Sequence, residues 1–399
     1  MRTEIKGSRA SEEISPWDAC LKEDLDFAAS APLPFEDLRG ETVLVTGGSG
    51  FVGSSLVRAL LTINRTYDLG MTVAALVRNE DKARRILAPL EPGIDPGSGS
   101  RTKGDGDFRL IVGDVTEPLR CDGPVHRVIH TAAVTASSEM VSHPVRTIET
   151  AVRGTRSVLD LCREKGVRSA VYLSSMEVYG QFTLASGASG GGNGSEDSKE
   201  SLLVTEEMQG YVDPLAVRSN YPLTKRLSEN LCEAYLAEYG VPVRIARLAQ
   251  TFGAGVTPAE GRVFAQFARS VMRGEDIILH TSGRSEGNYC CIADAVTGIL
   301  AILLKGENGA AYNVSSPDAH MSIADMAEMC AEKLAGGKIR VVFDIPGDNR
   351  FGYAPETHMR LDASKLMALG WKPAFGPEES YTRLIRSMRS ERYHRLEQN

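Results

Sequence analysis

The sequence predicts an α/β protein, with a doubly wound parallel sheet and a smaller, interleaved α/β domain toward the C-terminus. Two observations lead to this fold class. Short apolar segments of strand length alternate with segments of helical apolar spacing, which is typical of a parallel sheet covered by helices on both faces. Three spaced glycines also lie between the first predicted strand and the helix after it. With 399 residues, the chain can bury a large core.

The N-terminal 40 residues precede the first strand and are polar and acidic. Within this segment, residues 15–27 have the spacing of a short amphipathic helix, which we expect to pack on the body of the protein.

The first strand begins at Val43 and runs into Gly47, Gly50 and Gly53, and a helical pattern follows at residues 54–61. One glycine allows a tight turn, one lets the backbone approach a pyrophosphate, and one lets the helix pack close to the strand. The start of the helix then offers free N–H groups and its positive dipole end to phosphates. This strand, turn and helix predict a dinucleotide-binding sheet of the Rossmann type.

The remaining elements follow from the same alternation. Further strands are expected at residues 71–77, 109–112, 127–130, 170–175 and 241–248, and further helices at 145–164 and 221–239. Residues 92–107 are rich in Gly, Pro, Asp and Ser and are expected to form an exposed loop, and residues 185–200 a mobile Gly-rich loop. We therefore divide the chain into an N-terminal extension at 1–40, a dinucleotide-binding domain at 41–250 and a mainly substrate-binding domain at 251–399.

Composition narrows the class of protein. The net charge of −7 gives no basic footprint for nucleic acid. The seven cysteines form no Cys-x-x-Cys pair, so free thiols in a reducing compartment are expected and no metal site is predicted. No apolar run reaches the length of a membrane span, and the N-terminus lacks a secretory apolar stretch. We expect a cytoplasmic enzyme that does not bind membranes.

Tyr221 and Lys225 form a Tyr-x-x-x-Lys pair on one face of a predicted helix. A lysine ammonium near a phenol favours the phenolate, so we expect the pKa of Tyr221 to fall below its usual value of about 10. Such a tyrosine can exchange a proton with a carbinol while a nicotinamide exchanges the hydride. A strand that ends at Ser175 lies between the glycine turn and this helix, which is the order that this chemistry needs.

These motifs resemble the extended short-chain dehydrogenase/reductase family, which includes nucleotide-sugar epimerases, dehydratases and decarboxylases. The resemblance covers roughly residues 41–390. The matching motifs lie at residues 46–53, 113–115, 130–133, 174–180, 221–225 and 247–253.

The resemblance implies a role for individual residues. Asp114 would bind adenine, Ala132 and Ala133 would line the nicotinamide side, Tyr221 would be the base, and Lys225 would also hold the nicotinamide ribose. The cofactor-binding set it implies is Gly47, Gly50, Phe51, Val52, Gly53, Arg78, Asp114, Val115, Ala132, Ala133, Tyr221 and Lys225. The substrate-binding set it implies is Ser175, Met176, Arg218, Thr251 and Arg262.

Within the family, the segment from Arg218 to Arg226 most resembles UDP-glucuronate decarboxylases. Glu177 stands where decarboxylases and 4,6-dehydratases carry a catalytic glutamate, which can exchange a proton at sugar C5. Met176 stands where dehydratases carry an acidic residue and decarboxylases a serine, and the missing acid disfavours dehydration. A 4-epimerase or a 4,6-dehydratase-type enzyme stays open as an alternative, and a non-catalytic dinucleotide-binding scaffold is disfavoured by the intact proton-transfer residues.

Two departures from the family pattern and one expected assembly complete this comparison. Residues 285–289 lack the arginine that relatives often place against the diphosphate. Arg78 replaces the acidic residue that NAD-binding members carry, so a tightly bound NADP is slightly favoured over NAD, and a surface arginine stacked on adenine stays open as the alternative. The helices at 145–161 and around Tyr221 are those that relatives pair into an intermolecular bundle, so a homodimer is expected. Its apolar contacts would come from Ile148, Val152, Val158 and Leu161.

Overall fold

The computed structural model describes residues 18–87, 108–182, 202–346 and 356–398. Its centre is a seven-stranded sheet with the order β11-β7-β5-β4-β1-β2-β3, in which every neighbouring pair is parallel. The strands are β1 (Thr42–Thr46), β2 (Thr72–Val77), β3 (Phe108–Val112), β4 (Arg127–His130), β5 (Ser169–Ser175), β7 (Val243–Leu248) and β11 (Ala311–Val314). The predicted α/β fold class and the doubly wound parallel sheet are confirmed.

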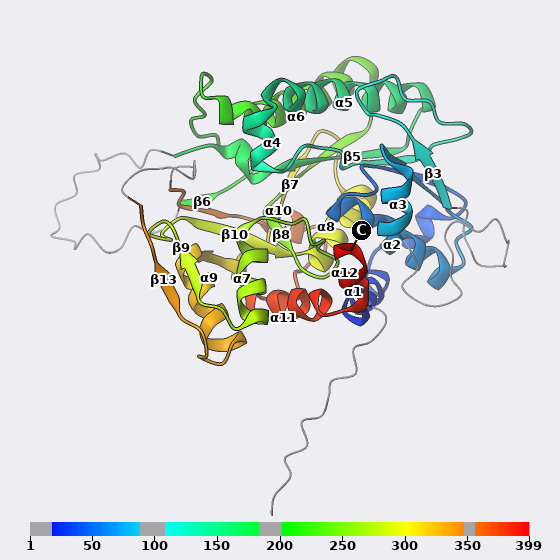
Figure 1. Ribbon diagram of the computed structural model, residues 1–399. Coiled ribbons are helices and arrows are strands. Elements are labelled where there is room, and N and C mark those ends of the chain that lie inside the picture. Colours follow the sequence, from blue (N-terminus) through cyan, green and yellow to red (C-terminus); the bar gives the residue numbers. More distant parts are fainter. Residues whose placement is uncertain (1–17, 88–107, 183–201, 347–355, 399) are drawn as a thin grey trace, which may run out of the picture.

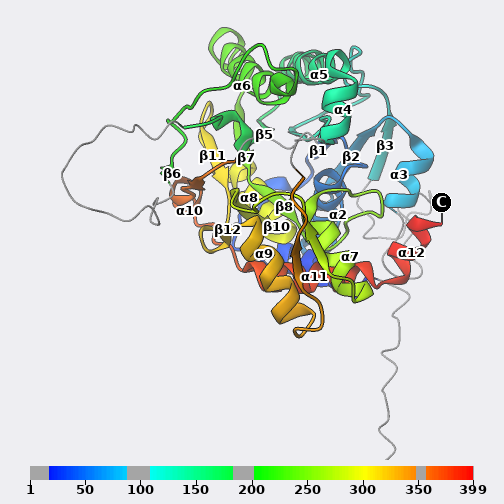
Figure 2. The ribbon, with the colours of Figure 1, turned by 60° about the vertical axis from the view of Figure 1, so that its left-hand side comes forward.

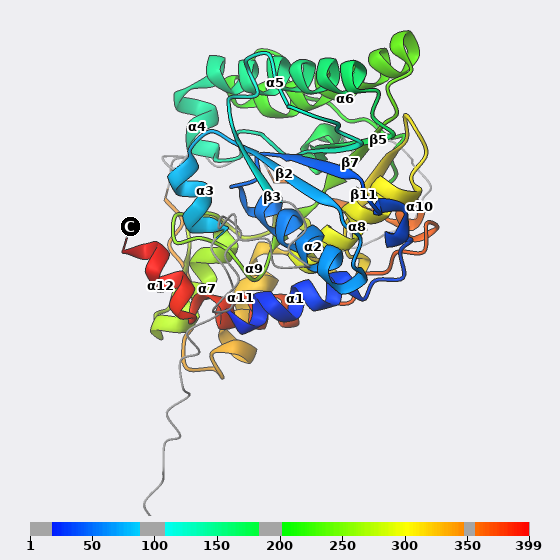
Figure 3. The same ribbon diagram turned by 90° about the vertical axis from the view of Figure 1, so that its right-hand side faces the viewer.

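Helices cover both faces of this sheet (Figures 1 and 3). One face carries α4 (Ser137–Ser142), α5 (Pro144–Lys165) and α6 (Asn220–Tyr239). The other carries α2 (Phe51–Tyr67) and α8 (Ile292–Lys305), and α3 (Glu80–Ile86) connects β2 to the part of the chain that leads to β3. With both faces covered, a site can form at the end of the sheet where the carboxyl ends of neighbouring strands β5, β4 and β1 lie side by side, which is where ligands bind in this type of fold.

The N-terminal extension packs on the body as expected. Its described part is α1 (Ala19–Ala29), which begins after Asp18, whose carboxylate accepts a hydrogen bond from Leu21 N at 3.0 Å. Buried Asp24 accepts a hydrogen bond at 2.7 Å from Arg383 on α11 (Pro377–Met388). This contact joins segments from the two ends of the chain.

The C-terminal part forms the smaller layer, shown from another side in Figure 2. It contains a three-stranded sheet of β8 (Gln250–Phe252), β10 (Glu286–Cys291) and β12 (His320–Ser322), and two strand pairs, β9 (Ile277–Leu279) with β13 (Val341–Phe343) and β14 (Met359–Leu361) with β6 (Leu202–Val204). Its helices are α7 (Val263–Arg273), α9 (Ile323–Met329), α10 (Ser364–Met367), α11 and α12 (Glu391–Glu397).

The chain crosses the expected domain boundary at residue 250 in both directions. Strand β11 and helix α8 follow that residue, yet β11 pairs with β7 and α8 packs under the large sheet. Strand β6 precedes it, yet β6 pairs with β14 of the smaller layer. The two expected loops at 92–107 and 185–200 lie outside the described residues. Among the helices that the structure describes, none combines the length and the apolar character needed to cross a membrane.

Candidate active site

The glycine turn has the geometry of a phosphate cradle. Gly47 has φ of 69°, and a Cβ there would lie 2.8 Å from Ala132 Cα on the segment after β4. A Cβ on Gly53 would lie 2.2 Å from the carbonyl oxygen of Gly47, so only glycine lets α2 start so close to the turn. Helix α2 begins at Phe51, earlier than the expected start at residue 54, and no side chain caps it at Gly50. Its first N–H groups are therefore available to a pyrophosphate, and a dinucleotide fits these residues.

The residues around this turn also connect the two layers. Phe51 packs against both large apolar cores, one under the sheet and one in the C-terminal layer. Val52, Ala132 and Ala133 are half-buried beside the turn. Val115 is instead a core residue, 5% exposed, and a Cβ on Gly154 of α5 would lie 2.9 Å from its Cγ2.

Positive charge gathers where β2 and β3 end. Burial pushes the pKa of Asp114 up, but hydrogen bonds from Thr116 N and Oγ1, both at 2.9 Å, together with the charges of Arg78 and Arg146 bring it below its ordinary value. Arg78 is exposed and therefore free to meet an anion. Sequence reasoning missed Arg146, because nothing in the helix pattern of residues 145–164 linked it to a strand end so far away in the chain.

Ser175, Glu177, Tyr221 and Lys225 come together at the carboxyl end of β5. The hydroxyl of Ser175 accepts a hydrogen bond from Glu177 N at 3.3 Å and so starts the 3₁₀ turn η2 (Met176–Tyr179). The Lys225 ammonium donates to the Leu173 carbonyl on β5 at 2.6 Å and lies 5.7 Å from the Tyr221 ring centroid. Helix α6 thus places Tyr221 beside the serine-bearing strand end.

The expected fall in the pKa of Tyr221 is wrong for this structure. Burial, assisted by the negative charge of Glu177, raises the pKa of Tyr221 to about 12, and the side chain of Ser175 only partly opposes this. Burial also lowers the pKa of Lys225 to about 8. The ammonium is directed at a backbone carbonyl and not at the phenol, so burial dominates both groups.

Arg218 and Glu177 form an ion pair at the mouth of this group. Arg218 NH2 donates to Glu177 Oε1 at 3.1 Å, and NH1 lies 3.1 Å from Oε2. The guanidinium carbon of Arg218 lies 5.9 Å from the ring centroid of Tyr221. The positive charge of Arg262 also acts on Tyr221, although Arg262 itself pairs with Glu260 at 2.7 Å.

Two residues of the expected substrate set lie deeper than the others. Met176 is 9% exposed and packs in the core under the sheet. Thr251 is 4% exposed, and its hydroxyl donates to the Ala249 carbonyl at 3.1 Å. Both are held by the protein interior, whereas Arg218 and Arg262 keep part of their side chains exposed.

A buried frame that the sequence did not reveal fixes η2. Arg226, next to Lys225, donates to the carbonyls of Val178 at 2.6 Å and Gly210 at 2.8 Å. Tyr179 OH donates to Asn313 Oδ1 at 2.7 Å and accepts from Arg247 NH1 at 3.0 Å. Arg247 in turn makes a buried, two-bond pair with Glu229 of α6, at 3.0 and 2.7 Å.

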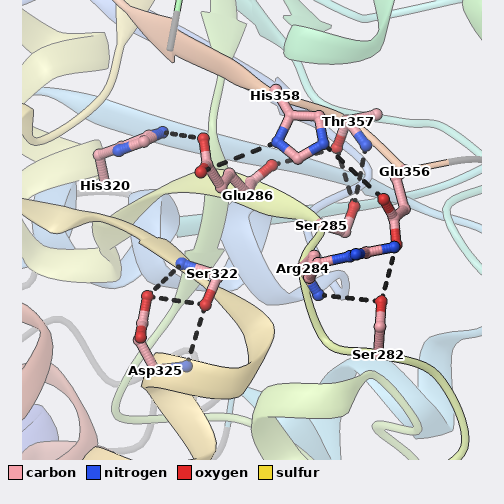
Figure 4. Close-up of polar contacts among 10 residues, drawn as sticks. All are labelled: Ser282, Arg284, Ser285, Glu286, His320, Ser322, Asp325, Glu356, Thr357 and His358. Atoms are coloured by element: carbon pink, nitrogen blue, oxygen red, sulfur yellow. Dashed lines mark hydrogen bonds and ion pairs between the residues drawn. The ribbon is translucent and has the colours of Figure 1, made fainter. Parts of the chain in front are cut away.

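The segment that lacks the expected arginine forms a different polar cluster, shown in Figure 4. The Glu286 carboxylate lies between two imidazoles, 3.4 Å from His320 Nε2 and 3.8 Å from His358 Nδ1. Arg284 is near, but it pairs with Glu356 at 3.4 Å. No group of three or more His, Cys, Asp or Glu in the described ranges is arranged to hold a metal ion.

Comparisons with known proteins show which family the chain matches. The model of the NAD dependent epimerase/dehydratase family matches residues 43–315. The chain is 28% identical over 353 residues to UDP-glucuronic acid decarboxylase 1 of Xenopus tropicalis, covering 88% of this chain and 73% of that protein. It is 29% identical over 333 residues to UDP-glucuronic acid decarboxylase 6 of Arabidopsis thaliana, covering 83% and 84%.

Solved structures show the same fold. The dTDP-glucose 4,6-dehydratase DesIV of Streptomyces venezuelae, as a double mutant with NAD bound, superimposes with a TM-score of 0.66 at 24% identity, covering 89% of this chain and 99% of that one. The UDP-glucuronic acid 4-epimerase of Bacillus cereus, in complex with UDP-glucuronic acid and NAD, superimposes with a TM-score of 0.63 at 18% identity, covering 87% and 98%.

Proposed function

Because the chain belongs to the NAD dependent epimerase/dehydratase family, we propose that it is a nucleotide-sugar enzyme that decarboxylates UDP-glucuronate through a 4-keto intermediate. The observation that carries the choice of reaction is Glu177, a carboxylate at the turn after Ser175 that is close enough to Tyr221 to raise its pKa. The similarity to UDP-glucuronic acid decarboxylases over most of the chain supports the same reaction.

The residues of the site divide the first step between them. Ser175 holds the sugar 4-hydroxyl, and Tyr221 accepts its proton. A bound nicotinamide dinucleotide supplies the acceptance and the return of hydride. Because burial raises the pKa of Tyr221 to about 12, most molecules hold the neutral phenol at pH 7, and the phenolate that accepts the 4-hydroxyl proton is the minor form. The Lys225 ammonium lies on the same helix and stabilises the negative charge as it develops.

The second step needs Glu177. Once C4 is a ketone, the uronic acid is a β-keto acid. The bond between C5 and C6 breaks, carbon dioxide leaves without the bonding electrons, and these electrons delocalise into the 4-keto group as an enolate. Glu177 then guides a proton onto C5, and no net oxidation has occurred after the 4-hydroxyl is restored.

A 4-epimerase acting on a related sugar is the second candidate, favoured by the fact that it needs Ser175, Tyr221 and Lys225 but no acid–base group at C5. A 4,6-dehydratase would need an acid beside the 6-hydroxyl, and Met176 is apolar and buried. A scaffold that only binds the dinucleotide would not need the proton-transfer residues at all.

Incubation of the purified protein with UDP-glucuronate tests the proposal. We expect release of carbon dioxide and a product of lower mass by mass spectrometry. Glu177→Gln should slow the return of a proton to C5 after the first oxidation and the loss of carbon dioxide, so steady-state release of carbon dioxide should fall and reduced nicotinamide should accumulate. Conversion of UDP-glucuronate to an isomer of unchanged mass, with full activity in Glu177→Gln, would replace decarboxylation by epimerisation.

For the cofactor, we infer a preference for NADP, tightly bound. Arg78, directly after β2, and Arg146 on α5 both act on Asp114, which follows β3, and a 2′-phosphate of the adenine ribose would lie beside Arg78. Arg78→Ala should weaken NADP binding about tenfold or more and NAD binding much less, because charge-assisted hydrogen bonds are lost. The check is calorimetric titration with both cofactors, and equal weakening of the two would contradict the preference.

We also propose a homodimer through α5 and α6, in a reducing, cytoplasmic compartment. Val158 and Leu161 pack in the chain's own core, so they are not free for a partner, whereas Ile148 on α5 and Leu227 on α6 are 43% and 51% exposed. Ile148→Glu combined with Leu227→Glu should give a monomer by light scattering at micromolar concentration. A wild-type mass near one chain would reject the dimer. All seven cysteines are free, buried thiols, which supports the compartment.

A further inference from the structure

The Arg218–Glu177 pair differs from the other ion pairs near the candidate site. Like the Arg247–Glu229 and Arg262–Glu260 pairs, it engages both oxygens of the carboxylate, here with two contacts at 3.1 Å, but both of its partners are open to solvent. The side chains are 34% and 41% exposed, so water reaches both partners. A pair of this kind is worth little in net terms, and another carboxylate can replace Glu177 at small cost.

Sugar geometry explains why the replacement would come from the substrate. In a hexuronate, C4, C5 and the C6 carboxylate are consecutive. With the 4-hydroxyl at Tyr221 and C5 near Glu177, the C6 carboxylate has to lie beside the group that adjoins both residues. That group is Arg218, which contacts Glu177 and lies 5.9 Å from the Tyr221 ring.

The other cations near Tyr221 are already committed. The guanidinium of Arg262 makes two hydrogen bonds to the Glu260 carboxylate, at 3.0 and 2.7 Å, and the backbone N–H of Arg262 donates to the same carboxylate. Lys225 is buried and donates to the Leu173 carbonyl. Among the described cations near Tyr221, Arg218 is thus held by fewer hydrogen bonds than Arg262 and is less buried than Lys225, so it changes partner most readily.

We propose that Arg218 selects a substrate with a carboxylate at C6, and that Glu177 occupies the position of this carboxylate on the guanidinium until the substrate binds. This inference rests on the proposed function, because it assumes that a nucleotide sugar binds with C4 at Tyr221. Binding would then have a second effect: it releases Glu177 from Arg218 before the steps at C5 begin. A neutral sugar, with a hydroxymethyl group at C6, would leave the pair closed.

The test compares the dissociation constants of UDP-glucuronate and UDP-glucose, which differ only at C6. Calorimetry is carried out on the full chain as purified, with Tyr221→Phe in every variant to prevent turnover. Arg218→Gln should weaken UDP-glucuronate about tenfold to a hundredfold and leave UDP-glucose nearly unchanged, since only the charged ligand loses its charge-assisted bonds. Arg340→Gln is the matched control, because it removes the same charge from a side chain that is 83% exposed and paired with Asp276.

Glu177→Gln provides the decisive arm, because it removes the internal competitor for Arg218. It should strengthen UDP-glucuronate binding about two- to fivefold and leave UDP-glucose unchanged. The gain should vanish when Arg218→Gln is also present. Retained UDP-glucose binding shows in each case that the variant is folded.

The remaining outcomes separate the two proposals. If Arg218→Gln weakens both sugars equally, or if Glu177→Gln strengthens UDP-glucuronate equally with and without Arg218, then Arg218 does not select the carboxylate, and the proposed function still stands. If neither sugar binds with Arg218 and Glu177 both present, the proposed function fails, and the role of Arg218 fails with it.

Discussion

Two arginine–glutamate pairs flank the turn that carries Glu177, and they differ in how they are held. Arg247 and Glu229 are each 10% exposed and belong to a network that continues through Tyr179 to Asn313. Arg218 and Glu177 are 34% and 41% exposed, and Glu177 has no comparable network behind it. The inner pair fixes the geometry of the turn, whereas the outer pair presents charge that a ligand can take over. We call the inner network the frame and the Arg218–Glu177 pair the rim. The two meet at η2, because Glu177 and Tyr179 lie in the same turn.

The frame determines where the reacting hydroxyl lies. Helix α6 carries Tyr221 and Lys225, and it also supplies Arg226 to the carbonyls of η2 and Glu229 to Arg247. Any shift of α6 would therefore move the tyrosine and the serine-bearing turn together. This coupling preserves the distance that proton transfer requires, because small misplacements are costly in rate.

Tyr221→Phe should produce the largest effect, and only on chemistry. The substitution removes the proton acceptor but leaves both ion pairs intact, so we expect turnover to fall by about 10²–10⁴. The midpoint of thermal unfolding and cofactor binding should stay close to wild type. The measurements are steady-state turnover of UDP-glucuronate and a thermal melt. Turnover within a few-fold of wild type would show that Tyr221 is not the base.

Arg247→Met sharpens the contrast by breaking the frame without touching a reacting group. It leaves the Glu229 carboxylate buried and unpaired, so the free energy of unfolding should fall by about 3–5 kcal/mol. Arg218→Gln, at the rim, should cost less than about 1 kcal/mol. Urea denaturation of the wild type and the two variants measures both changes in the free energy of unfolding.

The matched control for the frame is the double variant Arg247→Met with Glu229→Leu, which removes both buried charges. It should recover much of the lost stability, since an apolar pair of similar size can replace a buried ion pair. If Arg218→Gln destabilised the protein as much as Arg247→Met, the rim would be part of the frame and could not exchange partners.

Local sequence signals were sufficient for the sheet and for much of the candidate site. The glycine spacing around Gly47 and Gly53 predicted the turn because φ above zero and close backbone packing admit few other residues. The strand at residues 170–175 and the helix at 221–239 were predicted from apolar periodicity, and the strand order then brings Ser175 and Tyr221 together.

The frame and the pKa values could not be predicted in the same way. Arg247 and Glu229 lie on different elements, and no periodic pattern links them. The Tyr221–Lys225 spacing was visible, but the hydrogen bond of Lys225 to Leu173, which directs the ammonium at the backbone, depends on tertiary packing. The expectation of a low pKa for Tyr221 was wrong because burial is a property of the folded chain and not of a four-residue spacing.

Lys225 yields the smallest and most diagnostic effect, a dependence on pH. Its pKa is about 8 in the folded protein and 10.5 for a lysine side chain surrounded by water, so between these values the unfolded chain holds more protons than the folded one. The cost of burying the ammonium is therefore fully present below pH 8 and is relieved as the pH rises toward 10.5. Relative to Lys225→Met, the wild type should gain stability over this range, as measured by urea denaturation at about pH 7 and about pH 9.5. Activity should report the same charge: the phenolate of Tyr221 becomes more abundant as the pH rises toward its pKa of about 12, but above pH 8 a neutral lysine no longer stabilises it, so turnover should rise up to about pH 8 and then level off. Turnover that rises as steeply above pH 8 as below it would mean that the charge of Lys225 does not assist Tyr221, and that Lys225 serves only to pack α6 against β5.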